Sequence, residues 1–280
     1  MSAVNPLRLG LSTPIVVQVP GIASPWEATA GPKELTRIAR AADDLGFDHL
    51  TCADHVGVPA ASAAGRGVTY WDPLATLSFL AAHTTRIRLA TSVLVLGYHH
   101  PLALAKSYGT LDRLSGGRVV LGVGVGSLAE EFALLGAAWQ DRGPLADAAL
   151  ARLRAAWGQR EVDGFVLEPH ATRTTVPIWV GGRTRRSLRR ALTLGTGWVP
   201  FGLRAADIAS MLAAPAGFDV VLSPGVPLDP QGDERDSLRR LESLRTAGAT
   251  HLTCTVRATD AAHYCDQLAA LRALVDRHLS

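Results

Sequence analysis

The sequence predicts an α/β protein, a (β/α)8 barrel that forms a single domain over residues 1–280. Short apolar, β-branched segments alternate with segments of helical period, and this strand–helix unit occurs eight times. No linker-like break divides the 280 residues, 48% of them hydrophobic, which suffice for one barrel or for two ordinary domains. An open, doubly wound sheet is the alternative. The number of units and the continuous pattern favour the closed barrel.

The predicted strands are short and apolar, as expected for strands that are buried on both faces. The clearest is residues 118–123, a β-branched run that follows the turn pair Gly116-Gly117. The first strand could resume at residues 15–19. In chain order the eight strands are residues 7–11, 47–52, 87–95, 118–123, 177–180, 197–200, 218–222 and 251–256.

Amphipathic patterns and cap residues define the helices between these strands. Asp72 is a good N-cap with Pro73 in the first turn, and Gly46 can end the first helix. Ser127, three residues before Glu130, has the form of a capping box. The predicted helices are residues 33–45, 73–83, 101–114, 144–157, 184–194, 205–214, 234–247 and 261–279, with a further helix that begins at 128.

Charge and cysteine content restrict the partners and the compartment. The net charge is +3 and the arginines form no long run, so nucleic acid is not implied, whereas an anionic small molecule is compatible. Cys52, Cys254 and Cys265 have no metal-ligand spacing and fit a reducing compartment with free thiols. Neither a secretory signal pattern nor a run of about 18 apolar residues is present. We expect a cytoplasmic protein that does not enter a membrane, from a high-GC, actinobacterial genome.

Asp54 and His55 follow the second predicted strand. In a barrel the functional residues lie at the carboxyl ends of the strands, so these side chains are expected at the functional end. Either could hold a ring or transfer a proton, a role suited to histidine near neutral pH. Alternatively, Asp54 caps a turn and His55 faces solvent.

Glycines end the fourth strand at alternate positions, Gly122, Gly124 and Gly126, with Ser127 next. Such glycines let an anionic ligand approach the backbone before a helix N-terminus. The spacing is not the dinucleotide-binding pattern, and a tight turn without any ligand explains it as well.

The fifth strand runs into Gly181-Gly182, which arginines follow at 183, 185 and 186. A Gly-Gly turn at a helix start with arginines around it can hold a phosphate. We expect the N–H groups of both glycines to face the phosphate, Arg183 or Arg185 to lie beside it, and Arg186 to be solvated. A solvated arginine face is the alternative.

Few side chains react on their own. His99-His100 lacks a carboxylate or cysteine at ligand spacing, so no metal site is predicted. The run from Gly124 to Ser127 lacks the second glycine of a nucleophile elbow. Glu130 and Glu131, adjacent in a helix, should point to different faces rather than act as a pair. Such a chain fits an enzyme whose cofactor supplies the reactivity.

Taken together, these motifs resemble those of the bacterial luciferase-like (β/α)8 flavin and deazaflavin oxidoreductases, over nearly the whole chain. The Asp54-His55 pair is similar to the branch that uses coenzyme F420, a deazaflavin. The matching segments are residues 39–50 (ARAADDLGFDHL), 54–55 (DH), 70–74 (YWDPL), 84–89 (TTRIRL), 101–106 (PLALAK), 111–118 (LDRLSGGR), 130–132 (EEF), 135–136 (LG), 141–143 (DRG) and 177–182 (PIWVGG).

The resemblance implies a cofactor ring at the barrel mouth, with its phosphate tail over the Gly-Gly turn. It implies a non-prolyl cis peptide at Ser92-Val93, in a bulge that supports the ring. It also implies that His55 and the adjacent Asp54 are catalytic. The cofactor-binding residues on this basis are Asp54, Ser92, Val93, Leu94, Gly124, Val125, Gly126, Ser127, Gly181, Gly182, Arg183 and Arg185.

Three features depart from the family pattern. Ser127 stands where some deazaflavin dehydrogenases carry a catalytic glutamate, Thr196 replaces a usual aspartate, and the segment 158–176, which normally helps to cover the site, is short. We expect an oxidoreductase that moves a hydride between reduced coenzyme F420, or a flavin, and a small organic substrate, as a homodimer. An FMN-dependent luciferase-like monooxygenase and a non-catalytic barrel that only binds the cofactor are the alternatives.

Overall fold

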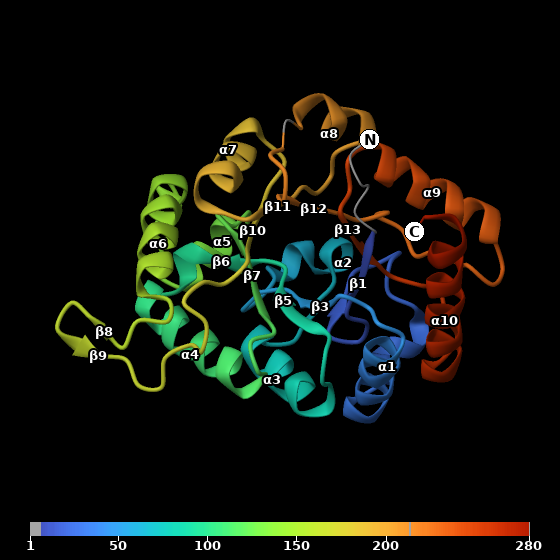
Figure 1. Ribbon diagram of the computed structural model, residues 1–280, viewed down its shortest axis with the longest axis horizontal. Helices are drawn as coiled ribbons and strands as arrows, with labels where there is room; N and C mark the ends of the chain where they lie inside the picture. Colours follow the sequence, from blue (N-terminus) through green and yellow to red (C-terminus); the bar gives the residue numbers. More distant parts are fainter. Residues whose placement is uncertain (1–6, 213, 280) are drawn as a thin grey trace.

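The barrel strands close on themselves in a computed structural model that describes residues 7–212 and 214–279. All neighbouring barrel strands are parallel; β13 pairs with β1, and β10 pairs with β7 to complete the ring. The (β/α)8 prediction is therefore confirmed, and Figure 1 shows the strands inside a ring of helices. The barrel strands are β1 (Arg8–Ser12), β3 (His49–Cys52), β5 (Arg88–Thr91), β7 (Val119–Gly124), β10 (Ile178–Gly181), β11 (Gly197–Val199), β12 (Asp219–Leu222) and β13 (His251–Cys254).

The helices of the ring lie close to their predicted positions. Asp72 caps its helix as expected, because its carboxylate accepts from Ala75 N at 2.7 Å. The helix predicted over 205–214 ends earlier, and position 213 lies outside the described residues, as do 1–6 and 280 of the predicted domain. In the described part of the chain, none of the helices is long and apolar enough to cross a membrane. The ring consists of α1 (Pro32–Asp44), α3 (Pro73–His83), α4 (Pro101–Leu114), α6 (Arg142–Ala156), α7 (Arg185–Leu194), α8 (Ala205–Met211), α9 (Glu234–Thr246) and α10 (Ala261–His278).

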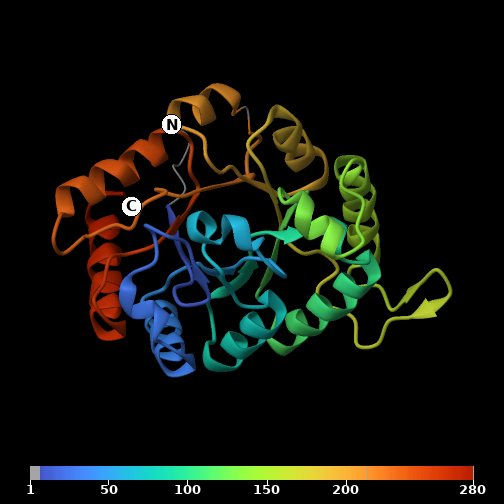
Figure 2. The ribbon, with the colours of Figure 1, turned by 180° about the vertical axis from the view of Figure 1, so that it is seen from behind.

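Short elements cover one end of the barrel. Residues 15–19 do not resume the first barrel strand; there, β2 (Val17–Gln18) pairs antiparallel with β4 (Thr69–Tyr70) outside the barrel. In Figure 2, α2 (Ala63–Arg66) lies over the middle of the ring, and α5 (Ala129–Leu134) lies nearer α6, both in front of the strands. These elements come from the loops that follow barrel strands, so they surround the functional end.

A bulge interrupts the strand predicted at 87–95. The Ser92–Val93 peptide is cis, as the resemblance implied, and β6 (Leu94–Val95) then pairs with the end of β7. The Val93 side chain packs against two neighbouring strands. A Cβ atom built on Gly124 would lie 2.7 Å from Val93 Cγ2, and one on Gly181 would lie 2.9 Å from Val93 Cγ1. The bulge therefore fits only because both strands carry glycine there.

Residues 158–176 form a hairpin, β8 (Glu161–Val162) and β9 (Phe165–Val166), that projects from the ring in Figure 1. The segment connects α6 to β10, so it belongs to the amino-terminal end of the strands. Arg173 bonds to Asp112 of α4 there. Contrary to the expectation from the resemblance, the segment does not cover the functional end.

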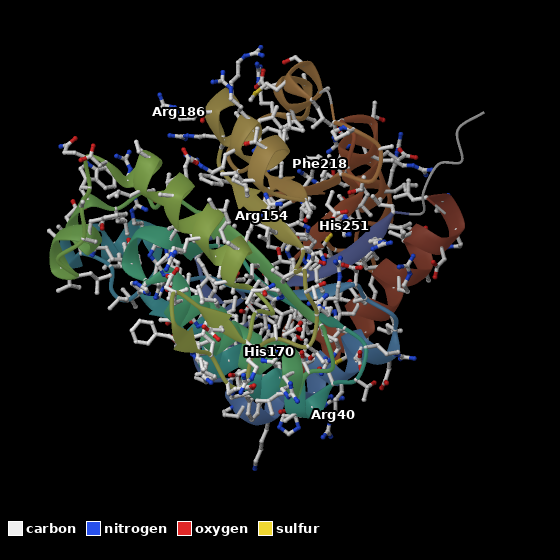
Figure 3. All side chains as sticks on the ribbon, turned by 60° about the vertical axis from the view of Figure 1, so that its left-hand side comes forward. Arg40, Arg154, His170, Arg186, Phe218 and His251 are labelled. Carbon is white, nitrogen blue, oxygen red and sulfur yellow. The ribbon has the colours of Figure 1, made fainter. Side chains whose placement is uncertain are left out.

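Four polar side chains fill the barrel interior at its amino-terminal end: Asp48, His49, Arg88 and His251, here called the basal cluster. His49 Nδ1 lies 2.8 Å from Asp48 Oδ2, and Arg88 Nη2 lies 3.0 Å from His251 Nε2. His49 is fully buried and His251 is 2% exposed; Figure 3 shows His251 inside the molecule. Space for a ligand along the barrel axis is therefore at the carboxyl ends of the strands.

The three cysteines are free, as predicted. Cys52 and Cys254 are buried, and this burial raises the pKa of each thiol to about 12. Neither thiol is a nucleophile at neutral pH, because the thiolate is the reactive form.

Candidate active site

A cavity of about 390 Å³ opens at the carboxyl ends of the strands; we call it the mouth cavity. Apolar side chains such as Val17, Val199 and Leu222 form much of its wall. It unites most of the residues predicted to form the site: Asp54, His55, Ser92, Val93, Gly124, Val125, Gly126, Ser127, Gly181 and Gly182.

Of the three predicted site residues outside the mouth cavity, Arg183 lines the adjoining cavity described below, and Leu94 and Arg185 line neither. Leu94 is 1% exposed and packs in the hydrophobic core, while its neighbour Val95 lines the mouth cavity. Successive side chains of a strand point to opposite sides, so only one of the two can face the cavity. Arg185 is exposed and lines neither this cavity nor the next.

A second cavity, of about 640 Å³, continues from the first and shares Val125–Ser127, Gly181, Gly182 and Phe201 with it. We call it the arginine cavity, because the charged residues that line it are Arg66, Arg142, Arg183, Arg186 and Arg190. Among the described residues no carboxylate lines it. The arrangement suits an anionic ligand.

The arginines differ in how firmly they are held. Arg190 is 7% exposed and pairs with Asp147. Arg142 lies over the Trp139 ring, with 3.6 Å from its guanidinium carbon to the ring centroid, which restricts the side chain. Arg186 is exposed, as expected, but it also lines the cavity; Figure 3 places it on α7 at the surface.

At Gly182 the Gly-Gly turn does not offer the N–H group that we expected. Gly182 N donates to Val199 O at 3.2 Å. A Cβ at position 182, where φ is +138°, would lie 2.6 Å from Ser187 Cβ, so the start of α7 requires glycine there. Among the described residues, the helix amides without an acceptor at this end are those of Arg185 and Arg186, and these can meet an anion.

Close packing explains the glycines in and just after β7. A Cβ at Gly122 would lie 1.9 Å from Thr91 O, and one at Gly126 would lie 2.5 Å from the Phe132 ring. The capping-box prediction is wrong: α5 follows Leu128 as its N-cap, without a side-chain cap. Gly126, with φ +80°, turns the chain so that Ser127 is exposed and lines both cavities.

His55 lines the mouth cavity, and two contacts hold its ring. Its Nδ1 lies 3.0 Å from Glu131 Oε2, and its ring centroid lies 4.6 Å from that of Tyr70 on β4. The structure thus supports the position predicted for His55 and adds Glu131 as its partner.

Sequence reasoning missed Glu131, which is 1% exposed. Its carboxylate accepts from Val56 N at 2.6 Å, Gly57 N at 3.2 Å and Tyr98 Oη at 2.8 Å, in addition to His55. Burial by itself would raise the pKa of Glu131, but these hydrogen bonds outweigh burial and lower it. The sequence held one weak signal, because position 131 lies three residues after the apolar Leu128 and therefore on the same side of the chain.

Asp54 lies beside His55 but is engaged differently. It is 5% exposed, and its Oδ2 accepts from Val95 N at 3.0 Å and lies 2.7 Å from His99 Nε2. The contacts fasten the residues after the bulge to the end of β3. His100 points elsewhere and accepts from Leu102 N at the start of α4, so the two histidines do not face a common point.

Thr196, which stands where the resemblance leads us to expect an aspartate, has a structural role. Its hydroxyl accepts from Ile178 N at 2.8 Å and lies 3.1 Å from Ile178 O, which links β10 to the residue before β11. It lines neither the mouth cavity nor the arginine cavity.

The family model for luciferase-like monooxygenases matches residues 7–218. The chain belongs to this family. A luciferase-like relative from Beutenbergia cavernae, an F420-dependent glucose-6-phosphate dehydrogenase, is 30% identical over 248 residues, 79% of this chain and 70% of the relative. An uncharacterised protein of Mycobacterium tuberculosis is 31% identical over 183 residues, 58% of this chain. That match spans 65% of the mycobacterial protein, slightly less than two thirds of its length.

Solved structures share the luciferase-like fold at low identity. The monooxygenase RslO1 from Streptomyces bottropensis has a TM-score of 0.76 at 21% identity, with 98% of this chain and 100% of the other covered. An F420-dependent secondary alcohol dehydrogenase, in complex with an F420-acetone adduct, has a TM-score of 0.73 at 14% identity, with 96% and 99% covered. At these identities the likeness shows the fold alone.

Proposed function

We propose that this luciferase-like protein is an oxidoreductase that transfers a hydride between coenzyme F420 and a small organic substrate. The proposal rests on one observation: the mouth cavity, whose wall is largely apolar, continues into the larger arginine cavity. A ligand with a flat ring and a long anionic tail matches both. Coenzyme F420 has a phosphate followed by a lactyl-oligoglutamate tail, whereas FMN has one terminal phosphate and offers these arginines fewer negative charges.

The residues around the two cavities fit such a cofactor. The bulge at Val93 and the backbone of Gly124 and Val125 would hold the ring, and Arg142 and Arg186 would hold the tail. The amino terminus of α7 would add the favourable end of its dipole. When bound, a deazaflavin supplies a carbon that accepts and donates hydride.

His55 is the proton-transferring group of the proposal. It would accept the proton of a substrate hydroxyl during oxidation and return it to a carbonyl oxygen during reduction. Ser127 supplies no acid or base at neutral pH, so we do not extend the proposal to sugar phosphates. We assign Asp54 a supporting role, because its contacts hold Val95 and His99 beside the cavity. A cytoplasmic location and a homodimer complete the proposal.

Titration of the purified protein with coenzyme F420 and with FMN, in parallel at several salt concentrations, tests it. We expect coenzyme F420 to bind at least about tenfold more tightly, with an affinity that falls as salt rises. Tighter binding of FMN would favour the luciferase-like monooxygenase instead. Tight binding of coenzyme F420 without hydride exchange with any alcohol or carbonyl compound of a broad panel would favour a barrel that only binds the cofactor.

A further inference from the structure

We propose that Glu131 holds His55 in the tautomer that carries its proton on Nδ1, so that Nε2 is left to accept a proton from the substrate. Glu131 is thus a positioning residue. The role of Nε2 rests on the proposed function, whereas the tautomer is a property of the protein alone.

The first step is that Glu131 is a carboxylate in the folded protein. Its side chain is buried, and three donors surround its two oxygens besides the His55 ring: two backbone amides on Oε1 and the Tyr98 hydroxyl on Oε2. A protonated carboxyl would bring a hydrogen of its own into this set of donors. The arrangement therefore favours the ionised form.

The second step concerns the proton of His55. An ionised carboxylate can only accept, so the contact of 3.0 Å between Oε2 and Nδ1 requires the hydrogen on the histidine. A neutral imidazole has one N–H, and Nε2 then carries the free lone pair. Among the described residues, Nε2 has no hydrogen-bond partner, and the ring lines the mouth cavity.

The third step concerns the substitution of Glu131 by glutamine, whose amide is oriented by two backbone N–H groups. Val56 and Gly57 donate N–H groups to Oε1, so in Glu131→Gln the amide oxygen should remain on that side. The amide nitrogen then faces His55, where it can only donate. Nδ1 must become the acceptor, and the proton of a neutral ring moves to Nε2. One isosteric change thus inverts the tautomer.

Nitrogen NMR of protein labelled with ¹⁵N-histidine tests this without any ligand. At about pH 9, where neutral imidazole dominates, two-bond proton–nitrogen spectra distinguish the tautomers, and His55→Gln identifies the signal. We expect Nδ1–H in the parent protein and Nε2–H in Glu131→Gln. Tyr98→Phe, which removes another donor from the same oxygen but keeps the carboxylate, should retain Nδ1–H.

An Nε2–H tautomer in the parent protein would overturn the inference, and so would an unchanged tautomer in a folded Glu131→Gln. If that variant does not fold, the parent and Tyr98→Phe spectra still decide. Where the parent turns over a substrate, Glu131→Gln should lower kcat by about 100-fold, with cofactor affinity within about threefold. Absence of turnover in the parent would refute the proposed function and leave the tautomer result standing.

Discussion

Val93 packs so closely on Gly124 that a Cβ atom at position 124 would lie 2.7 Å from Val93 Cγ2. The contact joins the bulge after β5 to the end of β7, and both residues line the mouth cavity. The shape of the cavity wall therefore depends on the absence of one side chain.

Gly124→Ala should destabilise the protein by about 1–3 kcal/mol, because the added methyl overpacks the bulge. It should also weaken binding of coenzyme F420, since the bulge must shift. Urea unfolding and cofactor titration measure the two effects. The double variant Gly124→Ala/Val93→Ala is the control and should be more stable than the sum of the single changes predicts. Strict additivity would contradict the contact as the cause.

Binding of the cofactor tail in the arginine cavity can be tested with one arginine variant and a matched control variant on the same helix. Arg186 and Arg189 both lie on α7 and are exposed, but only Arg186 lines the cavity. Arg186→Gln should weaken binding of coenzyme F420 by about three- to tenfold and reduce its salt dependence, because an exposed cation is partly screened. Arg189→Gln should change neither. Equal effects of the two would indicate a diffuse field rather than a site. Gly182→Val is a poorer probe, because its side chain would collide with Ser187.

His55→Ala should lower turnover by about 10²–10⁴-fold, the usual contribution of a general acid or base, while the affinity for coenzyme F420 changes little. The two quantities are measured by steady-state kinetics on a substrate of the parent protein and by titration. His99→Ala provides a comparison, because His99 bonds to Asp54 rather than to Glu131. Full turnover in His55→Ala would remove this residue from the mechanism.

The basal cluster predicts how stability depends on pH. Burial lowers the pKa of His251 to about 3, although Asp48 nearby opposes the shift. The unfolded chain, with a histidine pKa of about 6.5, then binds more protons than the folded protein between these values. Stability should be complete above about pH 6.5 and fall as the pH decreases towards about 3.

The same direction holds for two neighbours in the cluster. Burial also lowers the pKa of His49, and contacts with His49 and Arg88 lower the pKa of Asp48 against the effect of burial. Denaturant unfolding at about pH 4.5 and about pH 7.5 measures the difference in free energy. His251→Gln removes one titrating group and should make the difference smaller. If the free energy of unfolding of His251→Gln differed between the two pH values as much as that of the parent, groups other than His251 would cause the pH dependence.

Local patterns were sufficient to predict the fold. Strand and helix periods repeat in order along the chain, and cap residues fix several ends; α4, which begins at Pro101, has the predicted bounds. Barrel closure follows from eight such units, because parallel strands require helical crossovers. The bulge at Val93 divided a predicted strand, and only the resemblance indicated it.

The site could be predicted only in part, because side chains that meet there are far apart in sequence. Glu131 reaches His55 across 76 residues, so its spacing from Leu128 could indicate burial of the carboxylate but not its contact with His55. Arg66 ends α2 and Arg142 begins α6, and they join the arginines in and just before α7 only in the folded chain. Gly182 does not offer its N–H group to a phosphate as predicted, because this N–H group donates to Val199 O of β11.

The hairpin of β8 and β9 has a practical consequence. It projects from the ring in Figures 1 and 2, and its turn at Asp163 and Gly164 has positive φ angles, with Phe165 exposed beside it. Because it projects from the side of the ring, a peptide tag inserted in this turn would attach the protein to a support away from its mouth cavity. Catalyst immobilisation would then use the side of the barrel, and cofactor supply its open end.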